Sequence, residues 1–385
     1  MWLVEVVHGM SGLTVGQVRV VIAPDKFAGS LPASEVAAEF HHGWSDIRPG
    51  DDVVEVPLSD GGPGFIDCLA TGVPGQIETT DVSGPMREPT PARTFVSGSD
   101  WYIESAQACG LHLVDRRHRD PMRATTFGVG ELIRRAVAAG AQRMIVGLGG
   151  SATNDAGAGL LAALGAVARN EEGAPQDISL GPAGLIEVAD VDVAPARAAV
   201  AGIEIVIASD VDNPLLGPDG ASRMFGPQKG ATPADIDRLE SILGGFASCC
   251  AAPDLITRPG AGAAGGLGFG LMLLGGERQS GIDLIMRVTG LARLCDSADL
   301  VITGEGRFDE QSLHGKVVSG VVSAAGNTPV LVVAGQSNLT PEVAQAAGVA
   351  GVTTLLSHAS NCADAIARAA ELLRSVARDL ARSVS

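Results

Sequence analysis

The first strongly patterned segment of the chain is VRVVIA at residues 18–23, a run of mostly β-branched residues. Such a run is typical of a strand that is buried on both faces of a parallel sheet. A polar loop follows, and apolar residues then recur at helical spacing as far as Trp44. Ser30 is the expected N-cap of this helix, with Pro32 in its first turn, and residues 52–58 form the next expected strand. The chain is therefore predicted to begin as strand, helix, strand.

Strand and helix patterns continue to alternate toward the C-terminus. Residues 361–382 are Ala-rich and amphipathic, which predicts a terminal helix packed on the sheet. Alternating strands and helices indicate an α/β fold with a mainly parallel sheet. Further strands are expected at residues 77–82, 101–105, 143–148, 203–209, 300–303, 330–334 and 351–355.

Two tracts interrupt this alternation. Residues 83–95 are rich in proline, so we expect irregular or edge structure there and a crossing between domains. Residues 169–182 are the second loop-like tract. At roughly 100 to 200 residues per domain, a chain of 385 residues is long enough for two or three domains.

Composition narrows the class of protein. Hydrophobic residues make up 46% of the chain and charged residues 18%, which supports a large buried core and excludes disorder as the main character. The 27 Lys and Arg residues against 44 Asp and Glu give a net charge of −17, which repels polyanions. We therefore expect neither nucleic acid nor an anionic membrane as a partner, and any phosphate group must be bound locally.

The expected location of the protein is the cytoplasm. The first 19 residues lack the basic start and the small-residue cleavage pattern of a secretory signal. Residues 259–276 are uncharged, but 8 of these 18 residues are Gly, which argues against a membrane span. The 6 cysteines form no CxxC motif and no Cys/His cluster, so neither a disulfide framework nor a zinc site is indicated.

Five expected strands run into loops that carry Gly, Asp, Asn or Lys. In open α/β sheets, ligands bind beyond the carboxyl ends of the strands, so these loops are the candidate site. Glycine lets consecutive backbone N–H groups converge on phosphate oxygens, and 51 residues of the chain are Gly. The loops are PDKFAGS at 24–30, SDGGPG at 59–64, GLGGSATNDAGAG at 147–159, SDVDNPL at 209–215 and GEGRFDEQSLHGK at 304–316.

The loop at 147–159 leads directly into a helical pattern. Ser151, Thr153 and Asn154 stand at this helix start, so we expect them to form an anion cradle with the glycine amides. For any one loop, ordinary turns and helix caps are the alternative interpretation. Carboxylates in the other loops would hold Mg²⁺ or accept a proton from an attacking hydroxyl, and they are Asp60, Asp210, Asp212, Glu305 and Asp309.

Lysine is rare in this chain, with 3 residues against 24 Arg. Lys26, Lys229 and Lys316 all lie in glycine-bearing loops, where a compact charge suits phosphate or carboxylate. These loops are not Walker A motifs, because neither Lys26 nor Lys316 is followed by Ser or Thr. GAGAAG at 260–265 matches GxGxxG, but the LITRP segment before it is too short for the buried strand of a dinucleotide-binding fold.

Taken together, these loops strongly resemble those of the bacterial type I glycerate kinases. The resemblance runs from about residue 18 to the C-terminus, and eight segments in the family's order make it specific. The segments are VIAPDKFAGSL (21–31), LSDGGPG (58–64), MRATTFGVGELI (122–133), GLGGSATNDAGAGLLAALG (147–165), SDVDNPLLGPDGAS (209–222), FGPQKGAT (225–232), GAGAAGGLGFGL (260–271) and DLVITGEGRFDEQSLHGK (299–316).

The resemblance implies a two-domain α/β protein. A Rossmann-like parallel-sheet domain would comprise residues 1–78 and 270–385, with a second α/β domain of residues 79–269 inserted. The resemblance also implies transfer of a phosphoryl group from ATP, with Mg²⁺, to a hydroxyl of D-glycerate, giving 2-phosphoglycerate. The expected partner is therefore a small hydroxy acid. A homodimer is also expected, although the sequence itself does not determine the oligomeric state.

We assign roles within this activity as hypotheses. Asp60 or Asp210 would accept the hydroxyl proton. Lys26 and Lys316 would neutralise the γ-phosphoryl group or hold the glycerate carboxylate. The candidates for Mg²⁺ are Asp212, Glu305 and Asp309; those for ATP are Gly149, Gly150, Ser151, Asn154, Gly304 and Gly306; those for the substrate are Ser30, Gly61, Gly62 and His314.

Two segments depart from the family's pattern. The second loop normally reads DGGEGT, but here Pro63 stands in place of the Glu and Phe65 in place of the Thr, in a loop that should face the substrate. Residues 104–110 carry Gln107 and Cys109 where the family has small residues. Three functions stay open at this stage: a glycerate kinase, a kinase of the same fold acting on another small hydroxy acid, and a catalytically silent relative that binds ATP or a hydroxy acid as a sensor.

Overall fold

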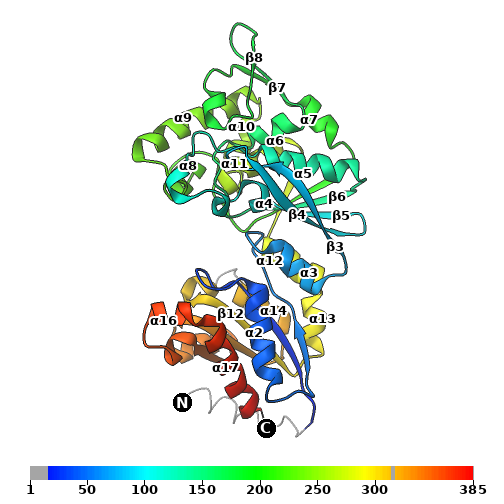
Figure 1. The fold of residues 1–385 in the computed structure, drawn as a ribbon, viewed down its shortest axis with the longest axis vertical. Helices are drawn as coiled ribbons and strands as arrows, with labels where there is room; N and C mark the ends of the chain where they lie inside the picture. Colours follow the sequence, from blue (N-terminus) through cyan, green and yellow to red (C-terminus); the bar gives the residue numbers. More distant parts are fainter. Residues whose placement is uncertain (1–15, 314–316, 385) are drawn as a thin grey trace. The chain divides into compact units, whose positions relative to one another are not determined.

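The computed structural model describes residues 16–313 and 317–384. Its internal contacts divide the chain into two compact units, each built around its own sheet with helices packed on it (Figure 1). The α/β fold class is therefore confirmed, while the domain bounds implied by the resemblance stay a prediction. Unit 1 comprises Met1–Ser59, Asp67–Val73 and Ile282–Ser385, and unit 2 comprises Asp60–Ile66 and Pro74–Gly281.

Unit 1 is built on a parallel sheet of five strands. In sheet order the strands are β14 (Gly351–Thr354), β13 (Val330–Ser337), β12 (Leu300–Phe308), β1 (Arg19–Pro24) and β2 (Asp52–Glu55). The helices are α2 (Ala33–Ser45), α13 (Leu291–Asp296), α14 (Val317–Ala325), α15 (Pro341–Ala346), α16 (Cys362–Ala367) and α17 (Ala369–Ser383), with 3-10 turns η5 (Glu310–Leu313) and η6 (Leu355–His358). Helices α3 (Phe65–Gly72) and α12 (Gly281–Thr289) begin in unit 2 and continue in unit 1.

Helices cover both faces of the unit 1 sheet, which explains its continuous apolar strands. Val20 and Ile22 of β1 share one apolar cluster with α2 and α17. Leu331 and Val333 of β13 belong to the same cluster, whereas Val332 and Ala334, which alternate with them along β13, share another cluster with α14 and α15. The predicted terminal helix is confirmed, except that it is divided at Arg368 into α16 and α17. This covered sheet holds the ends of its strands in fixed positions.

Unit 2 is built on a mixed sheet of six strands. In sheet order they are β11 (Glu277–Gln279), β10 (Glu204–Ala208), β6 (Arg143–Gly147), β5 (Asp100–Glu104), β4 (Pro89–Ser97) and β3 (Gln76–Ser83). A small sheet joins β8 (Pro175–Gln176), β7 (Val167–Arg169) and β9 (Asp190–Asp192). The helices are α4 (Ala106–Cys109), α5 (Phe127–Ala138), α6 (Ala158–Ala163), α7 (Ala194–Ala199), α8 (Ala221–Phe225), α9 (Pro233–Cys249), α10 (Pro253–Ile256) and α11 (Ala263–Leu273), with η1 (Leu111–Leu113), η2 (Arg116–His118), η3 (Pro182–Leu185) and η4 (Pro227–Lys229).

Irregular or edge structure was expected and is found, since residues 84–88 form a turn and residues 89–93 pair with β3 alone. The domain crossing expected at residues 83–95 was wrong. These residues lie within unit 2 and include most of β4, which pairs with β3 on one side and β5 on the other. Pro89 and Pro91 are tolerated because the pairing of β4 with β5 begins only at Thr94. Over the proline-bearing half, β4 therefore needs backbone N–H groups toward β3 alone. The other predicted strands are confirmed, with ends shifted by a few residues.

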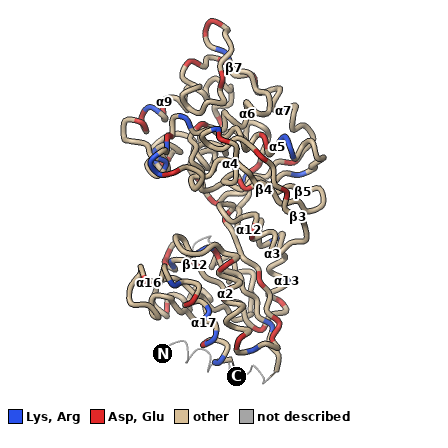
Figure 2. The backbone as a smooth tube through the Cα atoms, in the orientation of Figure 1, with Lys and Arg blue, Asp and Glu red and all other residues tan. Residues whose placement is uncertain are grey.

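The predicted cap of the first helix was also wrong. The N-cap of α2 is Pro32, and Ser30 Oγ instead donates a hydrogen bond to Phe27 O at 3.0 Å. Within the described ranges no helix has both the length and the apolar character needed to cross a bilayer. Figure 2 shows acidic and basic residues interleaved over both units.

Candidate active site

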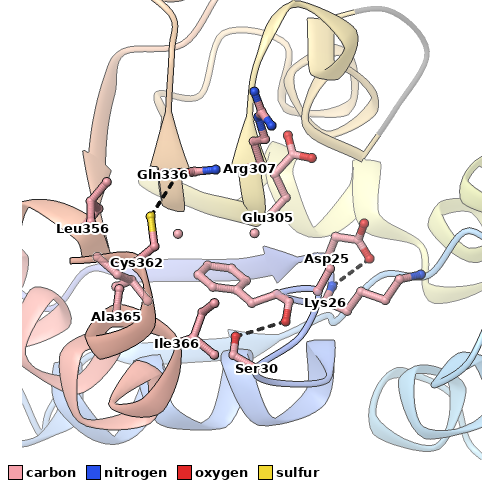
Figure 3. A pocket seen from close by; sticks show the side chains of 15 residues that line it. Asp25, Lys26, Ser30, Glu305, Arg307, Gln336, Leu356, Cys362, Ala365 and Ile366 are labelled. Carbon is pink, nitrogen blue, oxygen red and sulfur yellow. Dashed lines mark hydrogen bonds between the residues drawn. The ribbon is translucent and has the colours of Figure 1, made fainter. Parts of the chain in front are cut away.

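A cavity of about 350 Å³ lies in unit 1 beyond the carboxyl end of its sheet (Figure 3). Its wall is formed by the loop after β1, the ends of β12 and β13, and parts of η6 and α16. One end is charged and the other is apolar (Figure 3). The charged side chains are Asp25, Lys26, Glu305 and Arg307, and the apolar ones include Leu356, Ala365 and Ile366.

Backbone contacts fix the loop that carries Lys26. Asp25 N donates to Gly304 O at 2.8 Å, which continues the pairing of β1 with β12. Lys26 N in turn donates to Asp25 Oδ1 at 2.7 Å. Ser30 also lines the cavity, as does Glu305. The structure therefore brings residues predicted for catalysis, substrate binding and metal binding to one cavity.

Gly304 and Gly306 allow the backbone segments around this cavity to approach each other. A Cβ atom on Gly304 would lie 2.0 Å from Val333 O, and one on Gly306 would lie 3.0 Å from Ala28 N. Contacts this close exclude a side chain at Gly304. Packing alone accounts for Gly304, while Gly306 also lines the cavity. Their contact with ATP stays a prediction.

A second group of predicted residues lies in unit 2, where the loop starting at Asp60 meets the end of its sheet. A Cβ atom on Gly281 would lie 2.2 Å from Asp60 O. Asp60 Oδ1 accepts a hydrogen bond from Gly62 N at 3.0 Å, and Asp210 Oδ1 accepts one from Gly281 N at 3.1 Å. Gly281 thus contacts both acidic residues. The structure therefore brings Asp60, Gly61, Gly62 and Asp210 together at one edge of the unit 2 sheet.

Gly149 and Gly150 pack against the same loop. A Cβ atom on Gly149 would lie 2.6 Å from Gly62 Cα, and one on Gly150 would lie 2.6 Å from Pro63 Cγ. Gly150 has a φ of 62°, in the region that favours glycine. These two glycines therefore seat the Asp60 loop on the end of β6, and their contact with ATP phosphates stays a prediction.

Glu104 holds the Asp60 loop from the other side, a role that sequence reasoning missed. It ends β5 with 2% of its surface exposed, and Glu104 Oε2 accepts hydrogen bonds from Gly64 N at 3.1 Å and Ile66 N at 3.3 Å. Gln107 Nε2 donates to Glu104 Oε1 at 3.2 Å. The signal available in the sequence was an acidic residue at the end of an apolar strand, because a carboxylate that is buried there needs hydrogen-bond donors.

Replacing this carboxylate should loosen the loop. A hydrogen bond to a charged group contributes about 1.5–3 kcal/mol, so Glu104→Gln should make local opening easier by about 2 kcal/mol. We expect amide hydrogen exchange of residues 64–66 to become about thirtyfold faster, as measured by mass spectrometry. Glu187→Gln, at an exposed position of the same unit, is the control. Unchanged exchange in Glu104→Gln would show that Glu104 does not hold this loop.

Asp155 occupies the helix start that the sequence offered to an anion. Gly157 N and Gly159 N, at the beginning of α6, donate to its carboxylate at 3.1 and 3.2 Å. Thr126 N and Thr126 Oγ1 donate at 2.8 and 2.9 Å. Burial raises the pKa of the Asp155 carboxyl above its usual value, against the lowering effect of these donors. The anion that this helix start binds is therefore the protein's own carboxylate.

Ser151 and Asn154 are buried near this clamp. Ser151 is 3% exposed and Asn154 is 0% exposed, and Asn154 Nδ2 donates to Ser222 Oγ at 2.9 Å. The glycine-rich segment of α11 packs on the same stretch, since a Cβ atom on Gly265 would lie 1.9 Å from Thr153 O. The segment that matched GxGxxG is thus used for close packing. Contact of Ser151 and Asn154 with nucleotide stays a prediction.

Lys229 lies inside unit 2, with 2% of its surface exposed. Its Nζ donates to Thr153 O at 2.6 Å, so its charge meets a backbone carbonyl beneath the 147–159 loop. Burial lowers the pKa of Lys229 to about 8, while the nearby Cys109 and Asp155 oppose the shift. Burial also raises the pKa of the Cys109 thiol to about 12.

The lowered pKa of Lys229 predicts a pH dependence of stability. Between about pH 8 and about pH 10.5 the unfolded chain binds a proton at Lys229 that the folded chain has lost, so this residue makes stability rise with pH. We expect the free energy of unfolding of the wild type to rise by about 1 kcal/mol relative to that of Lys229→Met between about pH 7.5 and about pH 9. Urea unfolding of both proteins measures this. Parallel pH dependence in the two proteins would contradict it.

The sequence model of the Glycerate kinase family matches residues 20–385. This chain belongs to the glycerate kinase family. The glycerate kinase of Bacillus subtilis (strain 168) is 39% identical over 95% of this chain and 97% of its own length. The glycerate 2-kinase of Escherichia coli (strain K12) is 39% identical over 95% of this chain and 98% of its own length.

A solved structure shares the architecture. It comes from Salmonella typhimurium LT2, is provisionally assigned as a glycerate kinase 2, and is 39% identical, with a TM-score of 0.79 over 95% of this chain and 98% of that chain. The resemblance found in the sequence is confirmed. Membership of the glycerate kinase family makes the chain a kinase, which transfers a phosphoryl group to an alcohol, and implies that it uses ATP and a small-molecule substrate.

Pro63 and Phe65, the two departures from the glycerate kinase pattern within the Asp60 loop, have different surroundings. Phe65 is 0% exposed, starts α3 and lies with its ring centroid 6.2 Å from that of Tyr102. The Phe65 side chain therefore anchors the loop in the core of unit 2, while the prediction that the loop faces the substrate stays a prediction. Pro63 is exposed, so it is the departure that changes the surface of the loop.

The remaining candidates of the glycerate kinase site are spread over the chain. Asp212 Oδ1 lies 2.6 Å from Arg278 Nη2, and Asp309 Oδ2 lies 3.3 Å from Arg307 Nε. Among residues 16–313 and 317–384, no group of three or more His, Cys, Asp or Glu side chains is arranged to hold a metal ion. His314 and Lys316 lie outside the described residues.

Proposed function

We propose that this chain transfers the γ-phosphoryl group of ATP to the C2 hydroxyl of D-glycerate. The substrate oxygen forms a bond to the γ-phosphorus, the bond from that phosphorus to the ADP oxygen breaks, and the hydroxyl proton passes to a carboxylate. The observation that carries the proposal is the cavity shared by Lys26, Glu305 and Arg307 in a member of the glycerate kinase family. Phosphoryl transfer asks mainly for positioning and charge compensation, which such groups supply.

In this proposal, cations compensate the charge of the phosphoryl group, and a carboxylate accepts the proton. Lys26 is half-buried, where its charge acts more strongly on a phosphoryl group than it would in water. Lys316 is the second proposed cation. Asp60 or Asp210 accepts the hydroxyl proton, and the hydrogen bond that each takes from a backbone N–H fixes its orientation. Ser30, Gly61, Gly62 and His314 are the proposed substrate contacts, and Gly149, Gly150, Ser151, Asn154, Gly304 and Gly306 the proposed ATP contacts.

The described residues fit a magnesium ion that arrives with ATP. Mg²⁺ usually takes one or two carboxylates and completes its shell with phosphates and water, so a cluster of three protein ligands is not required. Glu305 lines the cavity, whereas Asp212 pairs with Arg278 and Asp309 with Arg307. We therefore expect Glu305 to hold the ion, with Asp212 and Asp309 as the other candidates. When bound, Mg²⁺ would compensate the charge of the phosphates.

A panel of acceptors tests the substrate. Purified protein receives Mg·ATP with D-glycerate, L-glycerate, glycolate or lactate, and released ADP is measured. We expect D-glycerate to give the highest kcat/KM, with the phosphate on O2 as determined by ³¹P NMR. A higher value with another acid would replace D-glycerate as the substrate, an alternative favoured by the exposed Pro63. Binding of ATP without turnover of any acid would instead indicate a catalytically silent protein that acts as a sensor.

A further inference from the structure

We infer that the apolar end of the unit 1 cavity binds the adenine ring of ATP, and that the triphosphate chain passes the charged end. This inference rests on the proposed function and adds the place and orientation of the nucleotide. Its basis is the division of the cavity into two chemically different ends, which come from separate segments of the chain (Figure 3).

The apolar wall includes a large hydrophobic side chain that is exposed to solvent and does not belong to the core of unit 1. Ile366 on α16 is 52% exposed, the highest value for a large hydrophobic side chain among the described residues. Leu356 and Ala365 line the cavity with it, while the neighbouring Leu355 is 1% exposed and belongs to the core of unit 1. A flat apolar ligand would cover this wall and remove its surface from water.

This wall distinguishes between the two substrates of a kinase. Glycerate is a small anion in which every carbon carries oxygen, so it gains little from apolar side chains. ATP has a planar aromatic base at one end and a triphosphate at the other. The cavity has the same polarity, since Leu356 and Ile366 lie at the opposite end from Lys26 and Arg307 (Figure 3). A volume of about 350 Å³ lies within the usual range for small-molecule sites.

Polar groups next to the apolar wall suit the edge of a base. Gln336, at the end of β13, lines the cavity and offers an amide with both donor and acceptor atoms. Cys362 Sγ lies 3.6 Å from Gln336 Oε1 and donates to it, which orients the amide (Figure 3). A base seated on Ile366 would therefore also cover the Cys362 thiol, which lines the same cavity.

Cys362 provides the experiment, because it is exposed whereas Cys68, Cys109, Cys250 and Cys295 are buried. The wild-type protein is treated with iodoacetamide, and alkylation of each cysteine is followed by peptide mass spectrometry. We expect saturating ADP to slow alkylation of Cys362 at least fivefold, and D-glycerate at the same concentration to leave it unchanged. Cys249, which is only partly exposed and lies in unit 2, is the internal comparison and should not respond to ADP.

Two matched variants test the wall itself. Ile366→Gln keeps a similar length but removes the apolar surface, so we expect KM for ATP to rise about tenfold with KM for D-glycerate unchanged. Val343→Gln makes the same kind of change at a 42% exposed position of α15 in the same unit, outside the cavity, and should alter neither constant. Equal KM values for ATP in the two variants would overturn the role of Ile366.

The outcomes separate this inference from the proposed function. ADP binding is measured by calorimetry on the sample used for alkylation. Turnover of D-glycerate together with unprotected Cys362 at saturating ADP would overturn the adenine site while the kinase activity stands. Protection of Cys362 by ADP without turnover of any hydroxy acid would support the adenine site and remove the proposed activity. Absence of ADP binding would overturn both.

Discussion

Lys26→Ala should lower kcat about a hundredfold while the protein stays folded. Lys26 is half-buried and lines the unit 1 cavity with Glu305 and Arg307. In the proposed reaction it meets charge that develops on the transferred phosphoryl group, and loss of one such group typically costs about 3 kcal/mol of transition-state stabilisation. Steady-state ADP release at saturating ATP and D-glycerate measures the change, and far-ultraviolet circular dichroism confirms the fold.

The control for Lys26→Ala is Arg382→Ala, which removes a 60% exposed cation from α17 of the same unit, outside the cavity. Its kcat should match that of the wild type. A kcat near the wild-type value in Lys26→Ala would contradict the role of Lys26 in phosphoryl transfer. A rise in KM for ATP with kcat unchanged would limit Lys26 to binding.

Asp155→Ala should destabilise unit 2 by about 4 kcal/mol, because it removes a fully buried carboxylate that satisfies four donors. The donors are the backbone N–H groups of Thr126, Gly157 and Gly159 and the hydroxyl of Thr126. They would stay buried without an acceptor, and the cavity left by the side chain adds to the loss.

Urea unfolding measures this in a Trp2→Phe, Trp44→Phe background, where Trp101 reports on unit 2. Two units in one chain unfold with separate transitions in general, so a local reporter is needed. Asp254→Asn, at an exposed position of α10, is the control and should leave the transition in place. An unchanged midpoint in Asp155→Ala would show that the four hydrogen bonds contribute little to stability.

The longer buried strands and their order along the chain were accessible from the sequence because buried parallel strands leave continuous apolar runs, whereas the two- and three-residue strands β7, β8, β9 and β11 were not predicted. VRVVIA is such a run, and it forms β1 within one residue of the predicted position. β4 escaped detection because proline normally argues against a paired strand. Its prolines are allowed only because β5 is too short to pair with them, and the length of a neighbouring strand is not visible in the segment itself.

The loops of the site were also accessible, since they follow the predicted strands and match family segments. The partners of their side chains were not. Asn154 and Asp155 are adjacent in a loop that suggested an anion cradle. Asp155 instead accepts a hydrogen bond from Thr126 N, and Asn154 donates one to Ser222 Oγ, although Thr126 and Ser222 lie far away in the sequence. The local sequence of a helix start is the same whether its backbone N–H groups bind a carboxylate of the protein or an anionic ligand.

The apolar wall of the unit 1 cavity could not be predicted for a related reason. Leu356 and Ile366 come from η6 and α16, which carry no motif of the family segments quoted above, and only packing of α16 against the strand ends brings them to Lys26. Glu104 is a comparable case, since its two backbone donors lie about 40 residues earlier in the chain.

The proposed activity is tested most directly by ADP release from Mg·ATP, with and without D-glycerate, in the wild type and in Asp60→Asn. Asn at position 60 keeps the shape of the side chain and an oxygen for Gly62 N, but it cannot accept the hydroxyl proton. We expect ADP release that depends on D-glycerate in the wild type and falls at least a hundredfold in Asp60→Asn, with ATP binding unchanged. Wild-type protein that binds ATP and releases no ADP with D-glycerate would contradict the proposed function.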